Sequence, residues 1–190
     1  MSPDLNNRLT LNEYLYALGN PLRWVDPDGR RVTIWTQAVV HGIYHASVHI
    51  VPENQDLYKN DSNFIPGPDG KIFATLGAGP SFLFTGSLVS KPDRQRDIDI
   101  SIKNLETLPL NIPFGTEDLI ISKLFRLDKN YNDDLPYQAF PTPLNNGYNS
   151  NSYVSGLLNT AGIDIPLLNL QINLPGFDKP VPASNFGEGK

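Results

Sequence analysis

The sequence contains no cysteine among its 190 residues. This absence excludes a disulfide framework, a thiolate zinc site and a cysteine nucleophile in the chain as written. Any covalent catalysis must therefore use another nucleophile.

Basic residues are scarce: 15 Lys and Arg stand against 20 Asp and Glu, which gives a formal net charge of −5 and a pI near 5.1. A protein that binds nucleic acid by neutralising phosphates has the opposite balance. We therefore expect no nucleic-acid partner.

Long apolar runs are also missing, because no stretch approaches the roughly 18 residues that a membrane-spanning helix requires. Residues 1–4, Met-Ser-Pro-Asp, lack the basic-then-apolar pattern of a signal peptide. We expect neither a membrane span nor an export signal in this sequence.

The composition that remains is typical of one packed domain, with 39% hydrophobic and 10% aromatic residues. The 15 Gly and 17 Pro predict short elements and long loops, and they disfavour a bundle of long helices. β-Branched content or alternation predicts strands at 32–36, 47–51, 72–76, 82–84 with 88–89, and 97–102. These five segments favour one antiparallel sheet.

Two helices are predicted. Thr116 can cap the first, whose apolar stripe comprises Leu119, Ile120, Leu124 and Leu127. The second begins near Ser150, places Tyr153, Val154, Leu157 and Leu158 on one face, and ends at Gly162. Residues 136–148 form a loop, and the Pro-rich tail 169–190 is expected to run extended over the surface. The predicted fold class is α+β, with one antiparallel sheet packed against about two helices.

Residues 12–30 combine Tyr-x-Tyr, Gly-Asn-Pro-Leu and Trp-Val-Asp-Pro-Asp-Gly. This sequence pattern resembles the motif that closes the core of Rhs/YD-repeat proteins, although Arg30 stands where that family commonly has Leu. The resemblance implies that residues 1–30 are the end of the Rhs shell and that residues 31–190 are a toxin domain. It also implies delivery into a target bacterial cell by type VI secretion, and a cognate immunity protein as partner. Asp26 and Asp28 are not expected to be catalytic.

All three histidines fall within nine residues, at His41, His45 and His49. On a helix they would share a face and could hold zinc, but Gly42 and the Val-His-Ile-Val sequence favour a strand. Two of them four residues apart on a strand are separated by about 13 Å, too far to share one metal. We therefore predict no metal or cofactor, and any single histidine can simply be a packing residue.

The segment 149–152, Asn-Ser-Asn-Ser, contains four residue types that favour helix N-caps. One interpretation is that Ser150 only caps the following helix. In the other, its hydroxyl is a nucleophile at the positive helix end, where free N–H groups stabilise an oxyanion and a histidine supplies the base.

The order of these motifs resembles that of circularly permuted papain-like hydrolases, which include NlpC-type peptidases and the lecithin retinol acyltransferase group. In that order a strand histidine precedes an Asn-Cys-x-x-aromatic-Val step that opens a helix. The resemblance implies that His45 is the general base and that Ser150 occupies the nucleophile position. A natural serine enzyme, a Cys-to-Ser inactive form and a degenerate site all remain open.

The third member of such a triad orients the histidine. Thr75 is the positional candidate, with His49 and Asn151 as alternatives. Asp97 and Asp99 alternate beside other charged residues and are interpreted as a solvated strand edge.

The leading hypothesis is an antibacterial toxin domain that hydrolyses an amide or ester bond, acting in the cytoplasm or periplasm of the target cell. Peptidoglycan peptide, protein and lipid ester are all compatible substrates. The alternatives are an Rhs-delivered ADP-ribosyltransferase or nuclease, and a non-enzymatic binding module.

Overall fold

The computed structural model describes residues 31–40, 42–83, 85–93, 95–98, 106–113, 115–165 and 172–188. The chain divides into two units, Met1–Arg30 and Arg31–Lys190, and the description below concerns the second. The Rhs-like motif at 12–30 lies outside the described residues.

The main sheet has five strands in the order β3-β4-β2-β1-β7, and every neighbouring pair is antiparallel. The strands are β1 (Arg31–Val40), β2 (Ile43–Val51), β3 (Ile65–Pro66), β4 (Ile72–Leu76) and β7 (Glu106–Pro109). A separate hairpin comprises β5 (Ala78–Phe82) and β6 (Thr85–Ser90). β5 follows β4 after Gly77 alone, so the chain leaves the main sheet at that point.

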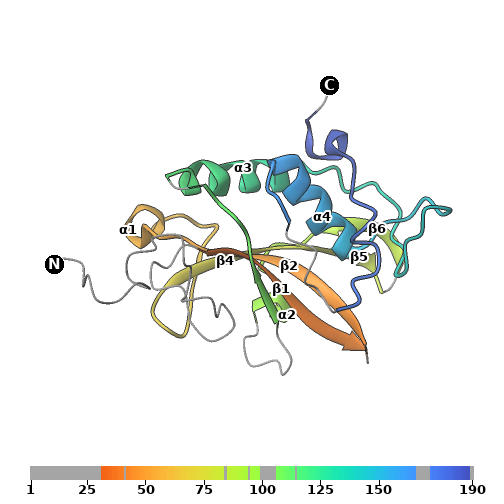
Figure 1. The fold of residues 1–190 in the computed structure, drawn as a ribbon, viewed down its shortest axis with the longest axis horizontal. Helices are drawn as coiled ribbons and strands as arrows, with labels where there is room; N and C mark the ends of the chain where they lie inside the picture. The colour runs from red at the N-terminus through yellow and green to blue at the C-terminus, as the bar shows by residue number, and fades with distance from the viewer. Residues whose placement is uncertain are drawn as a thin grey trace, which may run out of the picture. The chain divides into compact units, whose positions relative to one another are not determined.

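Two longer helices pack beside the sheet (Figure 1). They are α3 (Glu117–Lys129) and α4 (Ser150–Ala161), and the short elements are α1 (Gln55–Tyr58), α2 (Gln95–Ile98) and the 3-10 turn η3 (Ala183–Phe186). Alternate residues of β2, Ala46, Val48 and Ile50, are fully buried in the core that both helices share. The predicted α+β class is therefore confirmed.

Most predicted strands lie within observed ones, but two need correction. Phe82 ends β5 and Leu83 lies in a turn, so 82–84 is not a strand of its own. The strand predicted at 97–102 is wrong at its start, because Asp97 and Ile98 belong to α2, and residues 99–102 lie outside the described residues. Alternation misled the prediction there because Asp97, read as solvent-facing, is fully buried.

Both predicted helices are present, with differences at their starts. Thr116 precedes α3, but its hydroxyl donates to the Pro113 carbonyl instead of capping, and Leu119 is 73% exposed while Ile121 is buried. For α4 the cap is Asn149, and the helix ends at Gly162, which adopts a φ of 80° as a left-handed C-cap. The predicted apolar face of α4 is confirmed.

The tail does not run extended over the surface, and that expectation is wrong for residues 172–188. Phe177, Val181 and Phe186 are buried, and η3 forms near the end of the segment. The Val181 N–H donates to the Ser152 carbonyl of α4 at 3.0 Å. Three apolar side chains anchor a segment whose proline content alone predicted an extended path.

Candidate active site

Ser150 is the first residue of α4, and its hydroxyl does not serve as the helix cap. The preceding Asn149 takes that role: its Oδ1 accepts from the N–H groups of Asn151 and Ser152, each at 3.0 Å. The Ser150 side chain is therefore released from capping and is only partly buried. The interpretation that Ser150 only caps the helix is therefore wrong, because Asn149 is the N-cap.

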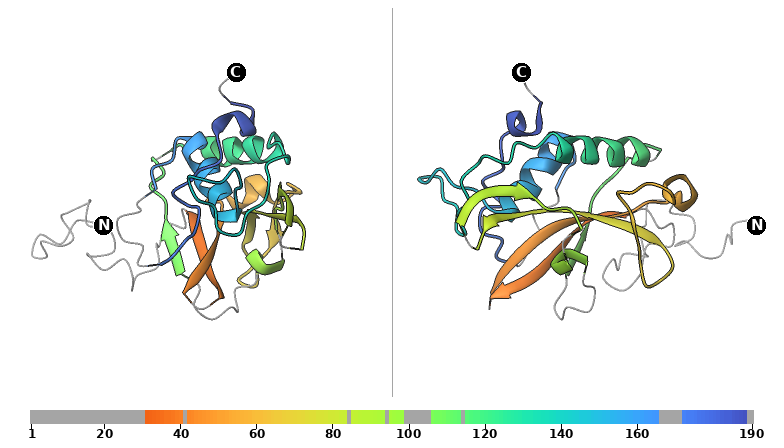
Figure 2. Two further views of the ribbon diagram at one scale, coloured as in Figure 1. Left: turned by 90° about the vertical axis from the view of Figure 1, so that its right-hand side faces the viewer. Right: turned by 180° about the vertical axis from the view of Figure 1, so that it is seen from behind.

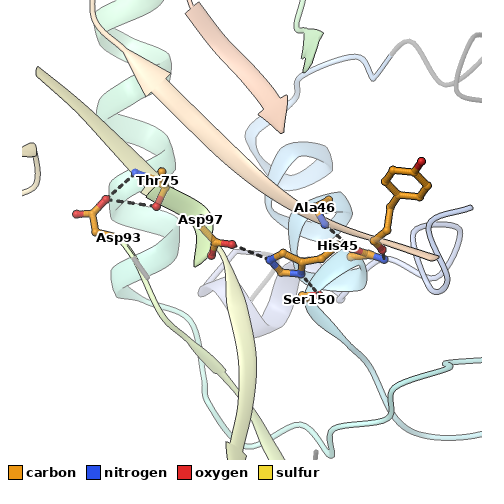
Figure 3. Close-up of polar contacts among 8 residues, drawn as sticks. His45, Ala46, Thr75, Asp93, Asp97 and Ser150 are labelled. Atoms are coloured by element: carbon orange, nitrogen blue, oxygen red, sulfur yellow. Dashed lines mark hydrogen bonds and ion pairs between the residues drawn. The ribbon is translucent and has the colours of Figure 1, made fainter. Parts of the chain in front are cut away.

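His45 lies on β2 and connects Ser150 to a carboxylate (Figure 3). Its Nδ1 is 2.6 Å from Ser150 Oγ, and its Nε2 is 2.9 Å from Asp97 Oδ1. The imidazole is 4% exposed and Asp97 is 0% exposed, so both are shielded from water. The three side chains, from β2, α2 and α4, form a continuous line of hydrogen-bonding groups.

The carboxylate fixes the role of each imidazole nitrogen. A carboxylate only accepts hydrogen bonds, so Nε2 carries the ring proton and donates a hydrogen bond to Asp97. In the neutral ring Nδ1 is then the acceptor for the Ser150 hydroxyl. This uses the ring in the opposite sense to a chymotrypsin-type triad, in which Nε2 faces the serine.

Asp97 is held in place by the end of β4 and the turn after β6. The Lys91 N–H donates to Gly77 O at 2.8 Å, and the Asp93 N–H donates to Thr75 O at 3.0 Å. Gly77 also lies directly against the carboxylate, because a Cβ at that position would be 3.1 Å from Asp97 Oδ2. The glycine therefore provides the space that the buried carboxylate occupies.

Thr75 is not the partner of His45, which corrects the sequence-based choice of the third triad residue. Its N–H donates to Asp93 Oδ1 at 2.7 Å and its hydroxyl contacts the same oxygen at 3.4 Å (Figure 3). Burial raises the pKa of Asp93, while the bonds from Thr75 act in the opposite direction. Thr75 therefore fastens the turn that precedes α2, and Asp97 contacts the histidine.

Asn151 joins the strand that carries His45 to the helix that carries Ser150. Its Oδ1 accepts from the Ala46 N–H at 2.8 Å, and its Nδ2 donates to Tyr44 O at 3.0 Å and to Pro175 O at 3.1 Å. Tyr44 and Ala46 flank His45, and Asn151 follows Ser150. One amide thus sets the separation of the two reacting side chains, so Asn151 acts through position and not as the orienting partner of the ring.

The start of α4 offers one N–H group to a developing oxyanion. The N–H groups of Asn151 and Ser152 are used by the Asn149 side chain, and that of Tyr153 donates to Asn149 O at 3.0 Å. Among the described residues the structure gives no acceptor to the N–H of Ser150. The sequence predicted several free N–H groups at this helix end, and among the described residues the structure leaves that of Ser150 for an oxyanion.

His49 does not join the site. His49 stacks on Trp35 with ring centroids 3.6 Å apart, and it also contacts Phe73. His41 lies outside the described residues. Within the part of the chain that the structure describes, no group of three His, Asp or Glu side chains could hold a metal ion.

A second carboxylate, that of Asp128, anchors the first turn of α4. Asp128 of α3 accepts a hydrogen bond from Ser90 Oγ at 2.5 Å and another from the hydroxyl of Tyr153, which is fully buried. Burial raises the pKa of Asp128, and the two hydrogen bonds oppose that shift. The same burial, together with the neighbouring charge of Asp128, raises the pKa of Tyr153.

Sequence reasoning found Ser150 and His45 but missed Asp97. No local signal distinguishes Asp97, because the alternation of residues 97–102 is typical of a strand with a solvated face and the observed α2 begins only after the turn that follows β6.

Scans of family models, curated proteins and solved structures find no protein that matches this chain. No helix among the described residues has the length and apolar character required to cross a bilayer.

Proposed function

We propose that the domain is a hydrolase that cleaves an ester or amide bond by acyl transfer. The observation that carries the proposal is the line from Ser150 Oγ through His45 to the buried Asp97, with separations of 2.6 and 2.9 Å. A serine hydroxyl needs a base within hydrogen-bond reach and a group that orients the base, and both are present.

The reaction runs in two steps. Ser150 Oγ bonds to the acyl carbon as its proton passes to His45 Nδ1, and the Ser150 N–H faces the oxyanion. The bond to the leaving group then breaks, and His45 returns the proton to the departing oxygen or nitrogen. Water next attacks the acyl-enzyme with its proton taken by His45, which releases the carboxylic acid and restores the Ser150 hydroxyl. Asp97 stays ionised and stabilises the imidazolium in both steps.

The serine is the feature that separates this site from the papain-like pattern that the motif order resembles. That pattern has a thiol at the position of Ser150, and the chain contains no cysteine. The short contact between Ser150 Oγ and His45 Nδ1 supports the partly exposed Ser150 as the native nucleophile. A Cys-to-Ser inactive form and a degenerate site are the alternatives that activity measurements distinguish.

The biological role we propose is that of an antibacterial toxin delivered by an Rhs-type carrier and type VI secretion. Support for it comes from the sequence of residues 12–30, and the role implies an immunity protein in the producing cell. Such a protein would block access to Ser150, because that residue is the partly exposed member of the triad.

Expression of the full chain in a bacterial host, in the cytoplasm or in the periplasm, tests this function. We expect growth arrest with the parent sequence and normal growth with Ser150→Ala or His45→Ala. Ser184→Ala, which changes an exposed serine far along the chain, is the matched control and should arrest growth. Arrest by Ser150→Ala contradicts the mechanism, whereas arrest by Ser150→Cys alone identifies an inactive form of a cysteine enzyme.

A further inference from the structure

Three segments that include His45, Ser150 and the strands β4 to β6 carry no formal charge. Residues 32–52, 72–90 and 135–163 contain no Asp, Glu, Lys or Arg. The first segment includes β2 with His45, the second includes β4 to β6, and the third includes α4 with Ser150. His45 and Ser150 therefore lie on segments that carry no formal charge, whereas α2 supplies the buried carboxylate of Asp97.

The same segments hold most of the large apolar side chains that the described residues expose. These are Val39, Phe82 at 74%, Leu83 at 75%, Phe140 and Leu144 at 98% exposure. We call these five side chains the apolar tips. The remaining two, Leu57 and Leu119, lie on α1 and α3.

The segments that carry the apolar tips lie at one end of the described domain. The turn between β1 and β2, the turn between β5 and β6, and the loop 136–148 all lie at the end where α4 begins (Figures 1 and 2). Hydrogen bonds hold the loop on β6, from the Tyr137 N–H to Gly86 O at 2.8 Å and from the Leu88 N–H to Leu135 O at 2.7 Å. Large exposed apolar side chains gathered at one end of a domain are typical of an interaction site.

Lys179 and Lys91 contact these segments, and both are engaged in hydrogen bonds. Lys179 Nζ donates to the carbonyls of Thr142, Asn145 and Gly147 and lies over the Tyr148 ring. Lys91 Nζ donates to Pro80 O at 2.5 Å. Both side chains are therefore directed at backbone carbonyls of the protein.

We propose that the apolar tips seat on the surface of a zwitterionic lipid bilayer and that the bond cleaved at Ser150 is an acyl ester of a lipid. The substrate part of this inference rests on the proposed hydrolase function. Insertion of the tips buries apolar surface, and the chain segments that carry the tips contain no formal charge. The net charge of −5 supplies no attraction to anionic lipid, which selects a net-neutral surface.

The chemical step then has a defined balance. A bond forms between Ser150 Oγ and the fatty acyl carbon, the bond from that carbon to the glycerol oxygen breaks, and His45 gives the proton to the glycerol oxygen. Water hydrolyses the acyl-serine, so one lysolipid and one fatty acid are produced for each water consumed.

Co-sedimentation of the full chain with phosphatidylcholine vesicles tests the surface. The Ser150→Ala form is used so that vesicles stay intact, and added salt should leave binding unchanged. We expect Phe82→Ser, Leu83→Ser and Leu144→Ser each to lower the partition coefficient about tenfold. Leu57→Ser and Leu119→Ser are matched controls that remove exposed leucines elsewhere, and binding should be unaffected.

Three results would overturn the proposal that the apolar tips bind a zwitterionic bilayer. These are no binding to phosphatidylcholine vesicles, an equal loss of vesicle binding in the control variants, or binding only to phosphatidylglycerol vesicles that salt abolishes. Hydrolysis of p-nitrophenyl acetate, compared between the parent and Ser150→Ala, reports the proposed function separately. Ester hydrolysis without vesicle binding refutes membrane binding by the apolar tips and supports the proposed hydrolase function. Vesicle binding with neither ester hydrolysis nor fatty-acid release refutes the lipid hydrolase.

Discussion

His45 and His49 lie four residues apart on the same face of β2, yet their surroundings differ completely. His45 contacts a serine and a carboxylate, whereas His49 is enclosed by the rings of Trp35 and Phe73. The difference arises from the neighbouring strand. β4 pairs with β2 only at Val48–Ile50 and then departs at Gly77, so the edge of β2 beside His45 is open to α4 and the tail.

This contrast teaches that the departure of one strand creates the site. Where β4 is absent, the Asn151 side chain and the Asn173 carbonyl take up the backbone groups of Tyr44 and Ala46 that a strand would otherwise bond. The replacement brings the start of α4, and with it Ser150, within reach of the histidine.

The largest effect should come from substituting the two histidines separately. His45→Ala should lower kcat for p-nitrophenyl acetate by about a thousandfold or more, because the serine loses its base. His49→Gln should leave kcat within about tenfold and cost about 1 kcal/mol of unfolding free energy through the lost ring stack. Steady-state kinetics and urea unfolding check both, and equal losses of kcat would remove the distinction between the two positions.

Asp97→Asn should lower kcat by a factor on the order of 10³, because an amide no longer fixes the proton on Nε2. Thr75→Val is the comparison, since its hydroxyl makes only the 3.4 Å contact with Asp93. It should keep kcat near the parent value. Kinetic measurements that find Thr75→Val more harmful than Asp97→Asn would restore the assignment made from the sequence.

Asn151→Ala should lower kcat by about tenfold and reduce the unfolding free energy by about 2 kcal/mol, because three hydrogen bonds disappear and two backbone groups of β2 lose their partners. The measurement is kcat at a temperature where unfolding data show the variant fully folded. An unchanged kcat there would mean that the spacing of His45 and Ser150 does not depend on this amide.

The smallest effect is expected at Asp128, distant from the open edge. Its pKa is raised in the folded state, so the parent binds this proton more tightly folded than unfolded. Stability is therefore lost as pH rises from the ordinary Asp value of about 3.9 through the raised value. Asp128→Asn lacks this loss. Urea unfolding should therefore show that the unfolding free energy of the variant increases relative to that of the parent as pH rises. The gain is about 1.4 kcal/mol for each unit of the shift, and a constant difference would contradict the raised pKa.

Local signals predicted much of this fold. Alternation and β-branched residues located β1, β2 and β4, and the cap residues with Gly162 located α4. The strand and helix predictions depend on residues close together in the sequence. For the base of Ser150, the scarcity of histidine left three candidates, and the resemblance to circularly permuted papain-like hydrolases selected His45.

Long-range placement is what the sequence could not supply. Asp97 and Thr75 are both polar residues near the ends of short elements, and only the path of the turn after β6 decides which one contacts the ring. The tail was misjudged for a related reason, since the burial of Phe177, Val181 and Phe186 depends on surfaces contributed by distant segments.

The contacts of residues 173–181 with β2 and α4 also determine when the site can exist. Asn173 O accepts from the Tyr44 N–H, and Pro175 O accepts from the side chains of both Asn149 and Asn151. A ribosome synthesises all three triad residues before it reaches this segment. Until those residues emerge, Ser150 and His45 lack the hydrogen bonds that align the segments carrying them. We therefore expect a chain that ends before residue 173 to lack the proposed hydrolase activity.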